Sequence, residues 1–155
     1  MLDEPRLVLL EATPIAVLPI VCSRTEIAQV MGPGLGELRA TVAAQGVDVT
    51  GPWFTHHLRI DANGFDFEIG VPVSHPIEAA GRVRPSEWPA MRAARTTYRG
   101  PFEGLGPAWG EFMGWMASHG HQAASDLWER YVVGPETTPD PTRWETELTR
   151  ALSTR

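Results

Sequence analysis

Near the N-terminus, apolar positions gather in short runs of the length typical of β-strands. Residues 7–11 and 16–21 are short, mainly apolar runs, and Thr13-Pro14 lies between them. Because proline has no N–H to donate to a neighbouring strand, it interrupts or ends a strand. The pattern therefore predicts one interrupted strand or two strand pieces.

A helix is predicted to follow. Ser23-Arg24-Thr25-Glu26 has the spacing of a capping box, in which the serine side chain caps the first turn and the glutamate accepts a hydrogen bond in return. Apolar residues then recur at helical spacing from Ile27 to Val42, on both sides of Gly32-Pro33-Gly34, where we expect a kink or close packing. Gly46 is the expected C-terminal stop, because glycine readily takes a left-handed conformation.

Beyond this helix the strand pattern returns. Residues 53–60 and 65–73 are extended, and Asp61-Ala62-Asn63-Gly64 between them is typical of a hairpin turn, because Asn-Gly suits positive φ angles. The first half of the chain is thus predicted to be strand, helix and hairpin.

The second half repeats this order. Gly32-Pro33-Gly34-Leu35-Gly36 aligns with Gly100-Pro101 and Gly104-Leu105-Gly106, and Glu68-Ile69 aligns with Glu147-Leu148. The expected elements are extended segments at 82–84 and 91–98, a helix over 107–118 before Gly120, a strand over 128–133, a proline-rich loop over 134–142 and a final strand over 144–152.

This repetition predicts an α+β fold of two strand-helix-strand-strand repeats, at about 5–75 and about 80–153, related by a pseudo-twofold axis. Their strands would form an antiparallel sheet with two main helices. A central pocket is expected at the seam of the repeats, where ligands commonly bind.

Composition limits the functions open to such a fold. A chain of 155 residues with 43% apolar side chains fits a single domain with one core. All thirteen basic residues are arginine, so lysine chemistry is excluded, and a net charge of -6 argues against direct nucleic-acid binding. The lone cysteine, the lack of a signal-like start and the lack of a long apolar stretch predict a soluble cytoplasmic protein without membrane contact. The lysine-free, Ala-, Gly- and Pro-rich composition suggests a bacterial source.

Several motifs occur together along the chain. They are Trp88-Pro89-Ala90-Met91-Arg92-Ala93, Tyr98-Arg99-Gly100-Pro101-Phe102-Glu103-Gly104-Leu105, Trp109-Gly110, Trp115-Met116, Asp126-Leu127-Trp128-Glu129-Arg130-Tyr131 and Glu147-Leu148-Thr149-Arg150-Ala151-Leu152, with Glu68-Ile69-Gly70-Val71-Pro72-Val73 in the first half. In combination they resemble GyrI-like small-molecule-binding domains, the effector-binding domains of AraC- and MerR-type regulators. Two residues depart from the family pattern: Phe102 stands where family members more usually have tyrosine, and Ala151 stands where proline is common.

The resemblance implies one GyrI-like domain over residues 1–155, with a pocket for bulky, flat, often cationic hydrophobic compounds. In family members a buried glutamate on the last strand faces aromatic rings, and by motif position this residue is Glu147. A carboxylate among ring faces attracts cations. Burial raises the pKa of a carboxyl group, so Glu147 is also a candidate general base.

The candidate ligand-binding residues are two glutamates and eight aromatic residues. They are Glu147, Glu68, Trp53, Phe54, Phe67, Tyr98, Phe102, Trp109, Trp128 and Tyr131. Most of the rings have a simpler interpretation as core residues, above all in the helical stripe of Trp109, Phe112, Met113 and Met116. Trp53, Trp128 and Tyr131 are favoured for the pocket because they lie on hairpin strands. Without the resemblance, both glutamates would be interpreted as solvent-facing strand residues.

No metal or cofactor is expected. His56 and His57 are adjacent and project to opposite faces of a strand, and His119 and His121 flank Gly120 without an aspartate or cysteine to complete a ligand set. Cys22 precedes a helix start, which lowers a thiol pKa, but a lone cysteine is usually a small buried apolar residue.

Three functions remain open. The first is binding of a hydrophobic or cationic small molecule for sensing or sequestration of drugs or toxins; the chain leaves no room for a helix-turn-helix, so a transcriptional role would need a partner. The second, which some stand-alone GyrI-like proteins perform, is hydrolysis of reactive cyclopropane-type genotoxins, with Glu147 as the base and Tyr98 or Tyr131 polarising the leaving side. The third is a protein-protein module such as a gyrase-binding inhibitor, for which evenly spread acidity gives weak support.

Overall fold

The computed structural model describes residues 2–23, 25–61 and 64–153, without the side chains of residues 28 and 59–61. It divides into two compact units, one formed by residues 11–90 and the other by residues 1–10 together with 91–155. Each unit contains antiparallel strands and one long helix. The chain therefore leaves its starting unit after the first strand and returns to it at Met91.

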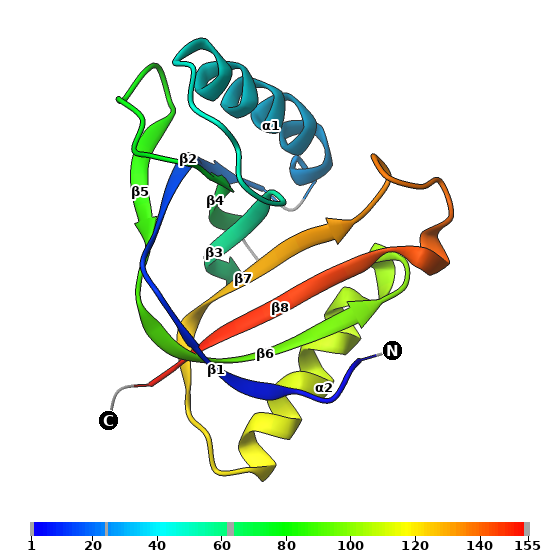
Figure 1. Ribbon diagram of the computed structural model, residues 1–155. Helices are drawn as coiled ribbons and strands as arrows, with labels where there is room; N and C mark the ends of the chain where they lie inside the picture. Colours follow the sequence, from blue (N-terminus) through cyan, green and yellow to red (C-terminus); the bar gives the residue numbers. More distant parts are fainter. Residues whose placement is uncertain (1, 24, 62–63, 154–155) are drawn as a thin grey trace. The chain divides into compact units, whose positions relative to one another are not determined.

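The unit of residues 11–90 is a four-stranded sheet with one helix. Its elements are β2 (Thr13–Cys22), α1 (Ile27–Ala44), β3 (Phe54–Asp61), β4 (Gly64–Pro72) and β5 (Arg84–Trp88). The strand order is β3-β4-β2-β5, with antiparallel neighbours. Helix α1 covers one face (Figure 1), where its Leu38 and Val42 pack with Leu18, Phe67 and Ile69. Alternation along β4 therefore places Glu68 on the face opposite α1.

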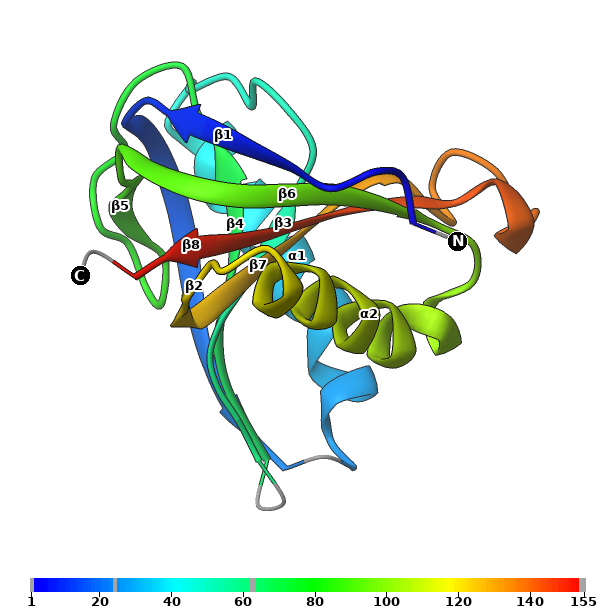
Figure 2. The same ribbon diagram turned by 90° about the horizontal axis from the view of Figure 1, so that it is seen from below.

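The unit of residues 1–10 and 91–155 has the same plan. Its elements are β1 (Arg6–Leu10), β6 (Met91–Arg99), the short 3-10 helix η1 (Phe102–Gly104), α2 (Leu105–Ser118), β7 (Ala123–Val133), a second 3-10 helix η2 (Pro141–Arg143) and β8 (Glu145–Leu152). The strand order is β1-β6-β8-β7, again antiparallel. Helix α2 runs along one face of this sheet (Figure 2), where Phe112 and Met116 pack with Ala94, Tyr98 and Leu148.

The α+β class, the antiparallel pairing and the two main helices are confirmed. Both units show the predicted order of strand, helix and hairpin. The edges differ from the expected boundaries of about 5–75 and about 80–153: β1 pairs with β6 of the second half, and β5 pairs with β2 of the first. Composition and periodicity do not determine which strand an edge strand pairs with, because any open strand edge can satisfy its backbone hydrogen bonds. The pseudo-twofold relation and the central pocket stay predictions.

Helix α1 begins with half of the predicted capping box. The carboxylate of Glu26 accepts a hydrogen bond from the backbone N–H of Ser23 at 2.9 Å, as expected for the returning bond. The serine hydroxyl instead lies 3.1 Å from the hydroxyl of Thr25, and no side chain caps the helix. Arg24, the remaining residue of the motif, lies outside the described residues.

Glycine stops both helices as predicted. Gly46 and Gly120 follow the last turns of α1 and α2 with φ angles of 70° and 75°, a conformation that strongly favours glycine. In the β3–β4 turn, Gly64 has a φ of 142°. The predicted turn residues Ala62 and Asn63 lie outside the described residues.

In the described part of the chain, no helix is both long and apolar enough to cross a membrane.

Candidate functional site

Glu147 lies on β8, on the sheet face opposite α2. Its neighbour Leu148 is in the core with α2, and strand alternation turns Glu147 and Thr149 to the other side. Both side chains are nonetheless buried, with exposures of 8% for Glu147 and 0% for Thr149. The interpretation of Glu147 as a solvent-facing strand residue is therefore wrong.

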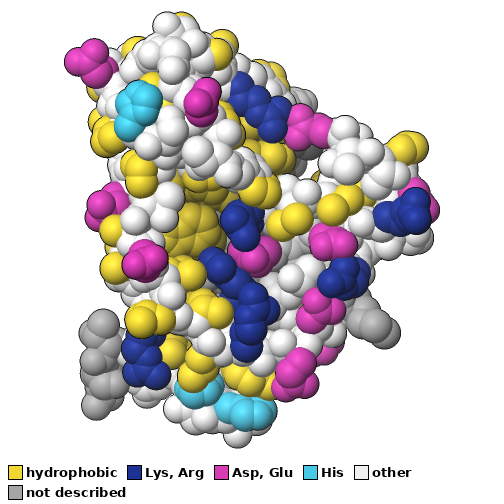
Figure 3. Space-filling model, viewed as in Figure 1, with side chains coloured by type: hydrophobic (Ala, Val, Ile, Leu, Met, Phe, Trp, Pro, Cys, Tyr) yellow, Lys and Arg dark blue, Asp and Glu magenta, His cyan; other side chains and the backbone are white. Residues whose placement is uncertain are grey.

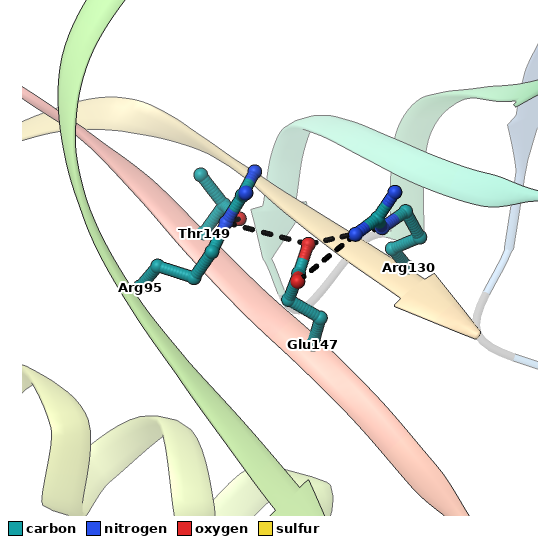
Figure 4. A network of polar contacts seen from close by, with 4 residues as sticks. All are labelled: Arg95, Arg130, Glu147 and Thr149. Atoms are coloured by element: carbon teal, nitrogen blue, oxygen red, sulfur yellow. Dashed lines mark hydrogen bonds and ion pairs between the residues drawn. The ribbon is translucent and has the colours of Figure 1, made fainter. Parts of the chain in front are cut away.

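Two arginines from neighbouring strands bind the carboxylate of Glu147 (Figure 4). Arg130 on β7 is its directly paired residue, and its Nε and Nη2 each donate to one carboxylate oxygen at 3.0 Å. Arg95 on β6 brings its Nε to 3.3 Å from Oε1, and the same nitrogen donates to the hydroxyl of Thr149 at 2.9 Å. We call Arg95, Arg130, Glu147 and Thr149 the Glu147 cluster.

The Glu147 cluster has an excess of positive charge. Its two guanidinium groups face one carboxylate, and Figure 3 shows dark blue side chains around magenta over strands β6 to β8. Burial lowers the pKa of Arg95; the charge of Glu147 opposes this, whereas those of Arg130 and Arg6 add to it. An arginine remains charged even so, because its pKa starts far above neutrality. The site is thus a cationic group of residues held together by one internal counter-ion.

Glu68, the second predicted glutamate, occupies the corresponding place in the other hairpin. It pairs across β3 and β4 with His56, whose Nδ1 lies 3.2 Å from its Oε1. The side chains of this pair are 17% and 23% exposed. In each hairpin, then, the glutamate of the second strand contacts a basic residue directly opposite on the first, which agrees with the alignment of Glu68 and Glu147.

Two of the predicted aromatic residues share the sheet faces that bear these glutamates. Trp128 lies two residues before Arg130, so both side chains project to the face opposite α2, and Trp128 is only 3% exposed. Phe54 lies on the Glu68 face, 1% exposed, with its ring 4.9 Å from that of Trp88. Trp88 was not among the predicted site residues.

Other predicted ring residues lie in the helix-covered cores. Phe67 is fully buried below α1, and Trp53 is partly buried against the same core. Tyr98 packs with α2 and donates its hydroxyl to the carbonyl of Pro101 at 2.8 Å. Trp109 packs at the border of that core. In the helical stripe, Phe112 and Met116 are buried at 0% and 1% exposure, so for these two the simpler core interpretation is correct.

Tyr131 projects to the α2 side of β7 and is engaged with a third glutamate. Its hydroxyl donates to Glu129 Oε1 at 2.7 Å, and the indole N–H of Trp109 donates to Oε2 at 2.7 Å. Burial raises the pKa of Glu129, and the two hydrogen bonds oppose that shift. The ring of Phe102 lies edge-on to that of Tyr131 at 5.9 Å and is tilted against that of Trp144 at 4.7 Å.

Sequence reasoning missed Arg95, Arg130 and Glu129 as site residues. Glu129 and Arg130 stand inside a recognised motif, and alternation with the apolar Leu127 indicated that Glu129 faces the helix. Arg95 had no such signal, because its contact with Glu147 depends on which strands pair.

A shallow depression of about 590 Å³ lies beyond the Glu147 cluster, at the ends of β6 and β8. It is lined by Arg99, Val133, Thr137, Thr138, Thr142, Arg143 and Glu145. Arg99 is bound there by Glu145 at 2.7 Å and by Asp3 at 3.0 Å. With no aromatic residue in its lining, this depression does not match the predicted pocket.

Metal-ligating residues do not gather in the described part of the chain: no group of three or more His, Cys, Asp and Glu side chains there could hold a metal ion. Cys22 is buried, and burial raises the pKa of its thiol. It therefore has the character of a small apolar core residue rather than of a nucleophile.

The described residues thus form an α+β fold that carries the Glu147 cluster on one face of a sheet. The family model of the GyrI-like small molecule binding domain matches residues 3–149. The chain belongs to the GyrI-like family, which confirms the resemblance found in its motifs.

Solved structures agree on the fold. The C-terminal domain of EcmrR is similar with a TM-score of 0.84 and 19% identity, over 98% of both chains. A chain of the EcmrR–DNA complex has a TM-score of 0.83 and 18% identity, and this protein spans 58% of its length and is itself covered to 98%. SAV2435 bound to tetraphenylphosphonium has a TM-score of 0.71 and 10% identity, over 98% of this chain and 95% of that one. A hydrolase from Listeria innocua has a TM-score of 0.71 and 12% identity, and the match covers 97% of this chain and 92% of the hydrolase chain. A search of curated proteins gave no match.

Proposed function

We propose that this protein senses or sequesters a planar, largely hydrophobic small molecule, which binds on the face of the β6–β8 sheet opposite α2. The Glu147 cluster is the polar anchor of the site, and Trp128 beside it contributes to the apolar wall. The observation that supports this most is the grouping of two arginines around the buried Glu147, with 14% of the Arg95 and 33% of the Arg130 side chain exposed, on a face away from the helix-covered core.

The reason is energetic. Removing charged groups from water is expensive, and well-packed apolar residues stabilise a fold as well as, or better than, a buried ion pair does. The buried Glu147 with its largely buried partner Arg95 is therefore poorly explained by stability alone, whereas a ligand site needs fixed polar groups in apolar surroundings. Membership of a small-molecule-binding family points the same way.

The solved structures that resemble this chain bear on the kind of ligand it binds and on its role in the cell. SAV2435 was solved with tetraphenylphosphonium, a bulky aromatic compound, and EcmrR was solved with DNA. For this chain, direct DNA binding is not part of the proposal, because its net charge of -6 opposes phosphate contacts.

A comparison of two glutamate variants tests the site. The full chain is titrated by calorimetry with a panel of planar aromatic compounds bearing negative, neutral and positive groups. At least one compound should bind, and Glu147→Gln should change its dissociation constant about tenfold or more, because charged hydrogen bonds contribute about 1.5–3 kcal/mol.

The matched control is Glu145→Gln, which removes the same charge two residues away on the same strand. It should leave the dissociation constant within about twofold, since exposed pairs contribute little. Melting curves establish that both variants are folded. Absence of binding by the whole panel, or equal effects of the two variants, would show that the site is not here.

Hydrolysis with Glu147 as general base is less well supported. Both carboxylate oxygens already accept hydrogen bonds from Arg130, and Arg95 approaches one of them. A base must present a free lone pair to the proton that it takes, and the side of the Glu147 carboxylate that faces Arg130 is already engaged. The protein-protein alternative has no specific observation in its favour.

A further inference from the structure

Positive charges outnumber negative charges around Glu147. Arg95 and Arg130 both contact its carboxylate. Arg6, on β1, is paired directly with Arg95 and so projects to the same face. Like charges opposite each other on paired strands repel. Two arginines thus contact one carboxylate and a third is paired with one of them, in a protein whose overall charge is negative.

Most hydrogen-bond donors of these arginines are unused. Each guanidinium group has five N–H donors. Arg95 engages only its Nε, with Thr149 and Glu147, and its Nη1 and Nη2 have no hydrogen-bond or ion-pair partner among the described residues, although only 14% of its side chain is exposed. Arg130 likewise keeps Nη1 free of partners in the described ranges. A largely buried guanidinium with unused donors is incomplete until a ligand or water accepts from it.

Glu147 is better placed to hold the arginines than to receive a cation. Each of its two oxygens accepts a hydrogen bond from Arg130, and the Arg95 guanidinium lies 3.3 Å from one of them. A cationic ligand would have to displace a guanidinium group or approach a region of net positive charge. Because Glu147 fixes both arginines without cancelling their combined charge, their remaining N–H groups are preorganised for an anion.

The charged residues next to the Glu147 cluster along the strands leave its net positive charge unchanged. Arg99 lies four residues beyond Arg95 on the same strand and is paired with Asp3 and with Glu145. These acids are thus engaged with their own arginine, and the uncharged Thr97 separates the two groups on β6.

We propose that the ligand is an organic anion, a carboxylate on a flat hydrophobic body, and that Arg95 and Arg130 bind its charged end. This rests on the proposed binding function and replaces the cationic preference expected from the sequence. The carboxylate accepts from the free Nη groups in the two-pronged geometry that guanidinium favours.

The test uses two probes with the same ring system and opposite end groups, 1-pyrenebutyrate and 1-pyrenebutylammonium. Each is titrated by calorimetry into the full chain. We expect the butyrate to bind at least about tenfold more tightly than the ammonium compound, and Arg95→Gln to weaken butyrate binding by about 10- to 100-fold without weakening that of the ammonium. Glu147→Gln should tighten butyrate binding, because it removes a negative charge beside the bound carboxylate while the amide oxygen can still accept a hydrogen bond from Arg130.

The matched control is Arg92→Gln. Arg92 is exposed on the same strand, projects to the other face and has no partner among the described residues, so its loss removes the same charge without touching the cluster. It should leave both affinities within about twofold. Arg130→Gln provides a second cluster variant should Arg95→Gln fail to fold.

The outcomes separate the two proposals. Tighter binding of the ammonium probe, or equal loss of butyrate affinity in Arg95→Gln and Arg92→Gln, would overturn the anion assignment and leave the proposed binding function standing. Absence of binding by either probe and by the wider panel would overturn both.

Discussion

At the residue scale, the family motif after β6 is explained by the space that Tyr98 needs. The tyrosine hydroxyl donates to the carbonyl of Pro101, and a Cβ added to Gly104 would overlap this hydroxyl oxygen. Gly100 has a φ of 140° and also faces the tyrosine ring. The two glycines therefore make room for a core ring rather than for a ligand.

Gly104→Ala should lower the free energy of unfolding by about 1–3 kcal/mol, the usual penalty of overpacking. In the Tyr98→Phe background the loss should be smaller, because the overlapping oxygen is gone. Denaturant unfolding of the four proteins of this double-mutant cycle measures the coupling. Gly106→Ala is the control: with no atom within 4 Å of an added Cβ, it should not destabilise. Equal losses in both backgrounds would show that another contact requires Gly104.

At the element scale, helix α1 is unusual in containing Gly32-Pro33-Gly34 and Gly36 without interruption. A kink or close packing was expected at these residues, and close packing is what Gly34 shows. An added Cβ on Gly34 would lie 2.9 Å from Cδ1 of Ile69 and 3.3 Å from Cδ1 of Ile20, so this glycine lets the helix approach the sheet. At Gly36 there is nothing within 4 Å. Close packing against the sheet therefore accounts for the glycine at position 34 but not for the glycine at position 36.

Gly36→Ala should raise the free energy of unfolding by about 0.5–1 kcal/mol, because alanine loses less backbone freedom in a helix. Gly34→Ala has the same gain in helix propensity but forces Ile69 and Ile20 to move, so its net effect should be clearly less favourable. Paired denaturation curves of the two variants measure this difference. If both stabilise equally, helix and sheet have more room than the packing at Gly34 indicates.

At the scale of the whole molecule, the stability of the GyrI-like fold should depend on pH through a histidine outside the Glu147 cluster. His57 on β3 is buried, stacks on Phe67 at 5.2 Å, and shares a 3.0 Å hydrogen bond with Thr55 through Nε2. Its Nδ1 has no hydrogen-bond partner among the described residues. Burial, with a smaller contribution from the charge of His56, lowers the pKa of His57 to about 4.

The unfolded chain takes up this proton near pH 6.5, whereas the folded protein does so only near pH 4. The unfolded state therefore binds more protons between these values, and the free energy of unfolding should fall by up to about 3 kcal/mol as the pH drops through that window. His57→Gln should show a smaller fall, measured by denaturation at a series of pH values. Glu129, whose raised pKa acts in the opposite direction, is common to both proteins and cancels in the difference. Parallel pH profiles would contradict the assignment.

Much of this protein followed from its sequence, because the signals concerned are local. Helix periodicity and the terminal glycines predicted both helices, the Asn-Gly turn predicted the first hairpin, and motif position led to Glu147 on the last strand. The helices and the hairpin depend on neighbours a few residues away, so one chain is enough to predict them, whereas the place of Glu147 followed from the family resemblance.

The tertiary structure alone decided what Glu147 does. Arg130 and Glu147 come from consecutive strands and Arg95 from a strand before α2, and only strand pairing brings the three side chains together. Sheet register also assigned β1 and β5 to their edges, and it placed Glu129 against Trp109. Backbone hydrogen bonds between strands are alike for every sequence, so pairing and the electrostatics that it creates emerge only when the whole sheet is assembled.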